Sequence, residues 1–174
     1  MSLKALDLFC GAGGLTRGLL EAGFEIAAAV DAWQPALDSY RANFPAHKAL
    51  LEDVSALTPE VLAQHGVGGA IDLIAGGPPC QGFSIQRIGG DLDDRNDLVL
   101  QFARIVRDVR PRMFLMENVP GLLGQRGRAT FSTLVRTLSA AGYRIDHSVL
   151  DAAGYGVPQH RRRVFVVGEL RGVA

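Results

Sequence analysis

The sequence predicts an α/β protein with a mostly parallel, doubly wound sheet, and three observations support this prediction. Apolar runs rich in β-branched and aromatic residues alternate with segments of helical period, as expected of βαβ units. A glycine cluster at residues 11–14 separates the first apolar run from the first helical segment, as in a nucleotide-type turn. The 174 residues are 48% hydrophobic and 21% charged, which suits one domain over residues 1–174 with a single core.

The expected elements follow in chain order. Strands are predicted at 4–9, 25–30, 47–51, 71–75, 112–117, 144–150 and 163–168, and helices at 13–22, 34–43, 58–65, 97–109 and 128–141. The last two helices have the clearest support, because their apolar residues recur at helical spacing on one face. These residues are Leu98, Phe102, Ile105, Val106 and Val109 in the first, and Phe131, Leu134, Val135 and Leu138 in the second.

Charge is divided between two parts of the chain, although the net charge is zero. Residues 1–85 carry four Lys/Arg and nine Asp/Glu, a net charge of −5. Residues 86–174 carry fourteen arginines, no lysine and nine Asp/Glu, a net charge of +5. Arginine suits phosphates and base edges better than lysine does, so we expect an anionic partner for the second part.

Several classes of protein are not expected. No apolar run approaches the roughly 18 residues needed to span a bilayer, and the N-terminus leads directly into a strand rather than a signal peptide. We therefore expect a cytoplasmic protein with no membrane partner. Cys10 and Cys80 lack metal-ligand spacing and make no disulfide scaffold, and the four histidines do not cluster. No metal is expected, and at least one thiol is free to react.

The first three strands each end near residues that suit a nucleotide. Glycines at 11–14 allow close backbone approach beside a helix N-terminus, or they simply form a tight turn. Asp31 ends the second strand about 20 residues later, where an acidic residue commonly accepts from ribose hydroxyls; alternatively it caps the next helix. Asp53 follows the third strand and could meet an adenine amino group or cap the helix after it.

A nucleophile is predicted after the fourth strand. Residues 76–84 read GGPPCQGFS, and the two prolines restrict the backbone in front of Cys80. A partly exposed thiol with a stabilised thiolate is reactive. The following segment, 85–96, is rich in Gly, Asp and Arg and is a candidate lid. Arg87 and Arg95 are candidate phosphate contacts there, although three aspartates of the same segment would repel a phosphate backbone.

Charged residues also lie at the fifth and last strands. Glu117 would emerge beside Cys80 if strands four and five are neighbours, and burial would raise its pKa and keep a proton available. The alternative is a carboxylate paired with an arginine. Strand alternation would put Gln159, Arg161 and Arg163 on one face, which favours an ordered site over a solvated edge. Ligands of open α/β sheets bind beyond the carboxyl ends of the strands, so we expect one combined site.

These motifs, in this order, resemble those of the cytosine-5 DNA methyltransferases. Residues 7–14, DLFCGAGG, are similar to the cofactor motif of the family. Residues 78–84, PPCQGFS, resemble its nucleophile loop, and residues 117–119, ENV, its base-contacting motif. Residues 159–163, QHRRR, match its Gln-x-Arg-x-Arg substrate motif. The match covers nearly the whole chain, and it implies a Rossmann-like S-adenosylmethionine-dependent methyltransferase fold.

The resemblance implies a mechanism in which the Cys80 thiolate attacks carbon 6 of a cytosine flipped out of double-stranded DNA. Carbon 5 then becomes nucleophilic and takes the methyl group of S-adenosylmethionine. Glu117, protonated or hydrogen-bonded at ring nitrogen 3, would draw off the charge that develops as the thiolate adds. Arg163 would hold the carbonyl oxygen of the ring, and Arg161 would support the thiolate and its loop.

The resemblance also implies binding residues. The cofactor residues of the family correspond to Phe9, Gly11, Ala12, Gly13, Gly14, Asp31, Asp53, Val54, Pro78 and Leu98, and its substrate residues to Gln81, Ser84, Asn118 and Gln159. Phe9 would stack on the adenine, Asp31 would bind the ribose, and Asp53 with Val54 would lie at the adenine edge. Family members often have Glu followed by Trp at the ribose position, whereas this chain has Asp31-Ala32-Trp33, so no role is assigned to Trp33.

The family pattern continues with a target-recognition region and two further motifs, which have no counterpart in this sequence. We expect a second polypeptide to carry them; the alternative is that they were removed from this chain. Two other functions stay open. An RNA cytosine-5 methyltransferase is one, although GFS at 82–84 looks more like the DNA members. A non-catalytic subunit that binds S-adenosylmethionine is the other, although such a subunit needs no nucleophile.

Overall fold

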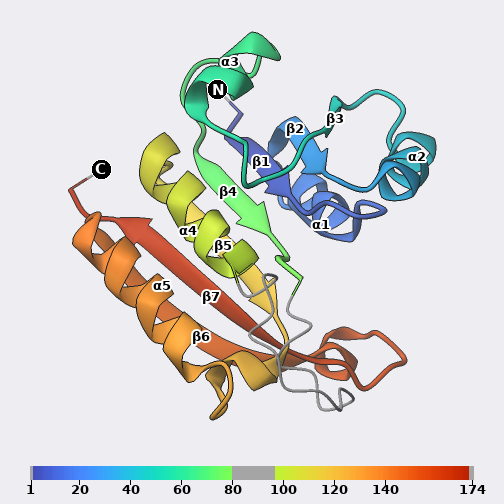
Figure 1. Ribbon diagram of the computed structural model, residues 1–174. Coiled ribbons are helices and arrows are strands. Elements are labelled where there is room, and N and C mark those ends of the chain that lie inside the picture. The colour runs from blue at the N-terminus through green and yellow to red at the C-terminus, as the bar shows by residue number, and fades with distance from the viewer. Residues whose placement is uncertain (1, 80–96, 173–174) are drawn as a thin grey trace.

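The computed structural model describes residues 2–79 and 97–172, and Figure 1 shows its central sheet with helices on both faces. The sheet has seven strands in the order β3-β2-β1-β4-β5-β7-β6. Strands β1 to β5 run parallel to one another. Strand β7 lies between β5 and β6 and is antiparallel to both. The predicted mostly parallel, doubly wound sheet is confirmed.

The described elements lie close to the predicted ones. The strands are β1 (Lys4–Leu8), β2 (Glu25–Asp31), β3 (Ala49–Leu51), β4 (Leu73–Gly76), β5 (Met113–Asn118), β6 (Tyr143–Asp151) and β7 (Arg162–Leu170). The α-helices are α1 (Gly14–Glu21), α2 (Gln34–Asn43), α3 (Pro59–Gln64), α4 (Asp97–Val109) and α5 (Arg128–Ala140). Two short 3-10 helices, η3 (Pro120–Leu123) and η4 (Ala152–Tyr155), were not predicted. Each is a single turn, too short to show a helical period.

Helices α3, α4 and α5 cover one face of the sheet, and α1 and α2 cover part of the other. On the first face, the Phe114 ring of β5 packs edge-on against Phe102 of α4 and Tyr143 of β6. On the second face, Leu19 of α1 packs against Ala5 and neighbouring residues of β1, β2 and β4. The helical periods predicted for α4 and α5 therefore correspond to the core-facing sides of those helices.

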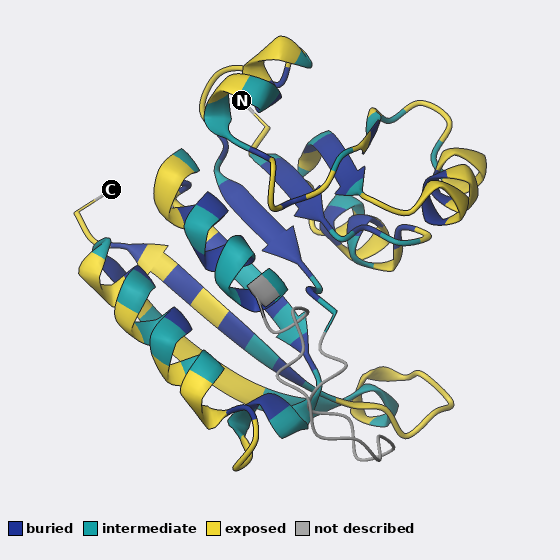
Figure 2. Cartoon of the chain, in the orientation of Figure 1, coloured by how far each residue is buried: buried dark blue, intermediate teal, exposed yellow. Residues whose placement is uncertain are grey.

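The sides of β5, β7 and β6 that face away from α4 and α5 have no helix over them among the described residues. We call this surface the open face and define it by Met113, Phe165 and Val167. Because only one side of β7 faces the core, buried residues alternate along this strand with more exposed ones, as Figure 2 shows. Met113 is 46% and Val167 39% exposed, and a hollow of about 510 Å³ lies over them. Large apolar side chains left in solvent mark a surface that is suited to contact.

Some predicted features lie outside the described residues. These are Cys80, Gln81, Ser84 and the candidate lid 85–96 with Arg87 and Arg95. Among the helices that the structure does describe, none combines the length and the apolar character that crossing a bilayer requires.

Candidate active site

The carboxyl ends of β1 to β5 meet at one edge of the sheet, as predicted. Strands β4 and β5 are parallel neighbours, with Gly76 opposite Met116. Glu117 is the next residue of β5, and a Cβ placed on Gly77 would lie 3.5 Å from its Oε2 atom. The segment that leads towards Cys80 therefore starts beside Glu117. The two strands are neighbours, which is the condition under which the sequence predicted Glu117 beside Cys80.

The glycine turn after β1 is held by side chains from β2 and α2. The amide of Gly11 donates to Asp31 Oδ2 at 2.9 Å, and Asn43 Nδ2 donates to the Ala12 carbonyl at 2.9 Å. Gly13 has φ +93°, and a Cβ there would overlap the Phe44 ring. At this position glycine is required both by the backbone and by the space. Phe9 has φ +57°, a costly conformation that non-glycine residues keep mainly at functional sites.

The two aspartates of this edge bind backbone amides. Asp31 accepts from Gly11 and, through Oδ1, from the Trp33 amide at 2.9 Å, so it ties the glycine turn to the start of α2. Asp53 Oδ1 accepts from the Ser55 amide at 2.8 Å. Helix α3 is instead capped by Thr58, so the alternative of Asp53 as the cap of that helix is wrong. Val54, the expected partner of Asp53, is only 2% exposed.

A buried carboxyl group lies beneath the glycine turn. Asp7 is inaccessible to solvent, and its Oδ2 accepts from Thr16 at 2.6 Å. Its Oδ1 has no hydrogen-bond partner among the described residues. Burial raises the pKa of Asp7 to about 6, with the nearby Asp31 charge adding to the shift. Sequence analysis assigned no role to Asp7, although a carboxyl group within an apolar strand was a signal for one.

Cys10 does not have the environment of a nucleophile. It is 5% exposed, and burial raises its pKa far above the usual value, with Asp7 and Asp31 adding to the effect. A thiol held in its protonated form is a poor nucleophile. Of the two cysteines, the described environment therefore excludes Cys10 from thiolate chemistry at neutral pH.

Glu117 is paired with Arg163 of the last strand and with Arg161 of the loop just before it. Its Oε1 lies 2.9 Å from Arg163 Nε and 3.8 Å from Arg161 Nη2. The side chains of Glu117 and Arg163 are 27% and 23% exposed, whereas that of Arg161 is 52% exposed. The paired carboxylate, which the sequence left as an alternative, is therefore what the structure contains. Because β5 and β7 are antiparallel neighbours, residues 46 positions apart meet at this edge.

The loop before β7 is fixed by Asp151. Its Oδ1 accepts from the amides of Ala153 and Arg161, and its Oδ2 lies 3.1 Å from His160 Nδ1. The hydrogen bond to His160, with the backbone amides, lowers the pKa of the Asp151 carboxyl. Asp151 thus fixes the backbone position of Arg161 at the end of the loop. Sequence analysis missed this residue, because only the pairing of β6 with β7 brings it to the arginines.

A cavity of about 310 Å³ adjoins the paired charges. Glu117, Arg161 and Arg163 form its polar part, and Leu150 and Phe165 contribute apolar surface. A few convergent polar groups on an apolar floor are typical of sites for small organic ligands. Gln159 and Arg161 both lie before β7, which begins at Arg162. The prediction that strand alternation puts Gln159, Arg161 and Arg163 on one face is therefore wrong, because only Arg163 is on the strand.

A family model described as C-5 cytosine-specific DNA methylase matches residues 3–173. The chain belongs to this family. The chain is 44% identical over 172 residues to the Type II methyltransferase M.AgeI of Thalassovita gelatinovora, covering 98% of this chain and 40% of the relative. It is 39% identical over 184 residues to M.AquIA of Picosynechococcus sp., covering 99% of this chain and 74% of the relative.

Solved structures support the fold of the methylase. A DNA modification methyltransferase encoded within an E. coli prophage superposes with a TM-score of 0.87 at 38% identity, covering 98% of this chain and 47% of the other. DNMT2 of Spodoptera frugiperda superposes with a TM-score of 0.77 at 29% identity, covering 99% and 51%. The predicted Rossmann-like methyltransferase fold is confirmed. The chain spans about half the length of these two proteins and 40% of M.AgeI.

Asn118 connects the two central strands of the methylase site. It is 2% exposed, and its Nδ2 donates to the Pro78 carbonyl at 3.1 Å. Its Oδ1 accepts from the Val119 amide at 2.8 Å. Both ends of the amide are therefore occupied within the chain. Leu98, the last of the predicted cofactor residues, lies half-buried in the first turn of α4. Within the described residues, no group of His, Cys, Asp and Glu side chains is suited to hold a metal ion.

Proposed function

We propose that this methylase transfers a methyl group from S-adenosylmethionine to carbon 5 of a cytosine flipped out of double-stranded DNA. The observation that carries the proposal is the Glu117–Arg163 pair, supported by Arg161, beside the segment that leads to Cys80. A cytosine in this position has a ring nitrogen and a carbonyl oxygen for those groups to bind. The membership of the chain in the C-5 cytosine-specific methylases names the base and the carbon.

The residues on the opposite part of the edge fit an adenosine. The glycine turn, Asp31 and the turn at Asp53 follow β1, β2 and β3, which are adjacent strands. Together they offer backbone amides and carboxylates over a length suited to a nucleoside. S-adenosylmethionine bound there would supply an electrophilic methyl group. Phe9, Pro78 and Leu98 are the further residues that we expect to contact it.

Cys80 begins the reaction by adding to carbon 6 of the cytosine. The thiolate electron pair forms the S–C6 bond, and the displaced ring electrons make carbon 5 nucleophilic. Glu117 in its protonated form would give its proton to ring nitrogen 3 and so neutralise the charge that develops there, while Arg163 binds the carbonyl oxygen. Carbon 5 would then take the methyl group of S-adenosylmethionine, whose methyl–sulfur bond breaks to release S-adenosylhomocysteine. Removal of the carbon 5 proton by a base expels the Cys80 thiolate and restores the aromatic ring.

Asn118 acts in this proposal by positioning the nucleophile and not by direct contact with the base. Its buried amide holds the carbonyl of Pro78, two residues before Cys80. A buried hydrogen bond to a backbone carbonyl is costly to break, because the carbonyl is left unpaired. Gln81, Ser84 and Gln159 remain the residues that we expect to bind the DNA substrate.

A second polypeptide is proposed to supply target recognition and the remaining motifs. The open face at Met113, Phe165 and Val167 offers apolar surface next to the paired charges. Exposed arginines of the second part of the chain, such as Arg126, Arg128 and Arg162, suit DNA phosphates. M.AquIA, of which this chain covers 74%, is an example of a relative much shorter than M.AgeI. The bacterial cytoplasm is where we expect such an assembly to act.

Trapping on a mechanism-based substrate tests the chemistry. Duplex DNA containing 5-fluorocytosine should give a covalent adduct with the chain in the presence of S-adenosylmethionine and the complementing polypeptide, because elimination needs a proton at carbon 5. Cys80→Ser should abolish the adduct, and Cys10→Ser should retain it. An adduct that survives Cys80→Ser, or one that forms with RNA and not with DNA, would overturn the proposal. Binding of S-adenosylmethionine without any adduct would favour the non-catalytic subunit.

Co-purification tests the second polypeptide. We expect the chain alone to bind the cofactor weakly and methylate little, and expect activity to rise when the product of the adjacent gene is added. Sequence-specific methylation at full rate by the chain alone would contradict this part of the proposal.

A further inference from the structure

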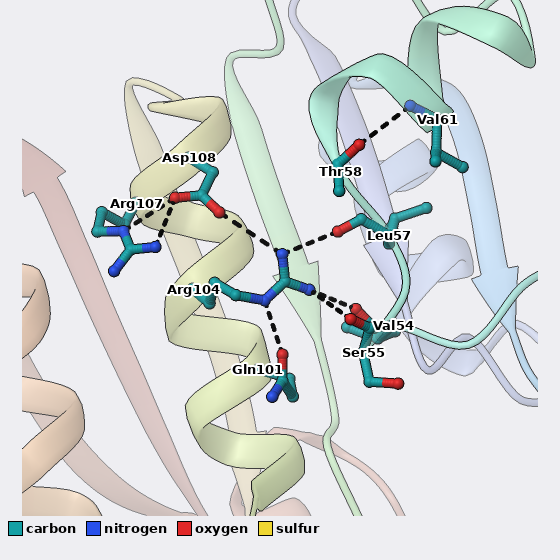
Figure 3. A network of polar contacts seen from close by, with 9 residues as sticks. All are labelled: Val54, Ser55, Leu57, Thr58, Val61, Gln101, Arg104, Arg107 and Asp108. Carbon is teal, nitrogen blue, oxygen red and sulfur yellow. Dashed lines mark hydrogen bonds and ion pairs between the residues drawn. The ribbon is translucent and has the colours of Figure 1, made fainter.

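Arg104 of α4 reaches across to the turn that follows β3, as Figure 3 shows. Its Nη2 atom donates to the carbonyls of Val54 at 2.7 Å and Ser55 at 3.2 Å, and its Nη1 donates to the Leu57 carbonyl at 2.9 Å. Its Nε donates to Gln101 at 2.7 Å. One guanidinium group therefore binds three backbone carbonyls of a turn about 50 positions earlier in the chain.

The chemistry of this contact is specific to arginine. Hydrogen bonds from a charged donor are roughly twice as strong as neutral ones. The planar fork of five N–H groups can bind several converging acceptors at once, which a lysine ammonium cannot match in geometry. Asp108 lies 3.5 Å from Nη1 on the next turn of the helix, and the Arg104 side chain is 24% exposed. The guanidinium is thus oriented from both sides.

The bound turn lies at the ligand edge of the sheet. It starts at Asp53, and the Glu52 amide donates to the carbonyl of Asp31, the residue that also holds the glycine turn. Asp53 and Val54 are the residues proposed above to lie at the adenine edge. A displacement of this turn would move the adenine contacts while leaving the glycine turn and Asp31 in place.

We propose that Arg104 is a positioning residue for the adenine of the cofactor, acting through the Asp53–Leu57 turn. The inference rests on the proposed function, since it needs a cofactor with an adenine ring. Arg104 touches neither the cofactor nor the DNA. It fixes the backbone that presents Asp53 and Val54, and so it determines how well the site distinguishes adenine from a related base.

Binding of two ligands by calorimetry separates this role from a purely structural one. S-adenosylhomocysteine and its inosine analogue differ only at one edge of the purine, where the 6-amino group is replaced by a carbonyl oxygen and ring nitrogen 1 gains a hydrogen. Wild-type protein, with its complementing polypeptide where activity requires one, should prefer the adenine ligand. Arg104→Met should weaken adenine binding by about tenfold and reduce the preference. Arg104→Lys should show an intermediate affinity for the adenine ligand and an intermediate preference for it, because an ammonium group can keep part of the contact.

Arg107→Met is the matched control. Arg107 is on the same helix and is 51% exposed, and it pairs only with the adjacent Asp108 among the described contacts. This variant should bind both ligands as the wild type does. For Arg104→Met, a KM for S-adenosylmethionine that rises more than kcat falls is expected.

Three outcomes are decisive. A lowered melting temperature with an unchanged preference for adenine, in either Arg104 variant, would show that Arg104 only stabilises the fold and would overturn the inference. If Arg104→Met does not fold, the smaller change in Arg104→Lys decides the question by the same criterion. Wild-type protein that binds neither ligand would overturn the proposed cofactor itself, so the two failures are distinguishable.

Discussion

The two ends of the ligand edge are built in different ways. Over β1, β2 and β3 the site consists of backbone turns that are held by side chains of the same chain, such as Asp31 on Gly11 and Arg104 on Val54. Over β5 and β7 it consists of the Glu117–Arg163 pair, partly exposed beside the open face. The first part already has its shape. The second part has suitably placed charges, but they are partly exposed, and water weakens the attraction between them.

This difference indicates what each part needs in order to work. Turns with satisfied hydrogen bonds can bind a nucleoside without further ordering. An ion pair in contact with water contributes little, and it becomes strong when water is excluded. We infer that the cofactor part is preorganised, whereas the catalytic part becomes effective only when DNA or a further polypeptide covers it. The predictions below test this contrast.

Replacing the better-placed arginine should have the largest effect. Arg163→Met is expected to lower kcat for methyl transfer by about 10²- to 10³-fold, as loss of one preorganised donor does. Arg161→Met should lower kcat by only about tenfold, because Arg161 is farther from Glu117 than Arg163 is and is more exposed. Both variants should bind S-adenosylhomocysteine as the wild type does, measured by calorimetry. Equal losses in the two variants would mean that the distances to Glu117 do not govern catalysis.

A methyl group on the glycine turn should disrupt the preorganised part. Gly13→Ala is expected to lower the free energy of unfolding by about 4 kcal/mol, because it combines a positive φ with a clash against Phe44. Cofactor affinity should fall with it. Gly14→Ala is the control, since a Cβ there has no neighbour within 4 Å. Urea unfolding measures both, and a similar loss in the two variants would refute the argument from the turn.

The buried carboxyl of Asp7 should make stability depend on pH in an unusual direction. Its pKa is about 6 in the folded chain, above the ordinary value of 3.8 for an aspartate, so the folded state retains the proton that the unfolded state releases. Stability should therefore fall as pH rises from about 4 through 6, by up to about 3 kcal/mol. Asp7→Asn should remove this part of the slope in urea unfolding at a series of pH values. Parallel pH profiles for the two proteins would contradict the assignment.

The open face should have the smallest effect on the isolated chain. Val167→Ser is expected to change the free energy of unfolding by less than about 0.5 kcal/mol, because the side chain is already exposed. Val166→Ser, at a fully buried position on the opposite side of the same strand, should cost about 2 kcal/mol or more. Val167→Ser should nevertheless weaken association with the complementing polypeptide in a pull-down assay. Unchanged association would exclude the open face from that contact.

The sequence by itself determined the order and type of the elements. Alternation and helical spacing depend on neighbouring residues only, so the faces of α4 and α5 and the seven strands were predictable from local pattern. The single ligand edge was also predictable, because parallel strands place their carboxyl ends together. The motifs at Asp31, Asp53 and Glu117 could therefore be assigned to one site before any contact was known.

Only the tertiary structure decided which groups of that site touch. Glu117 meets Arg163 through the pairing of β5 and β7, Asn118 meets the Pro78 carbonyl, and Arg104 meets a turn 50 positions away. The protonation of Asp7 depends on its burial beside Thr16 of α1, which in turn contacts Tyr40 of α2. Distances of this kind, and the exclusion of water, come from packing between remote segments, and no local period contains them.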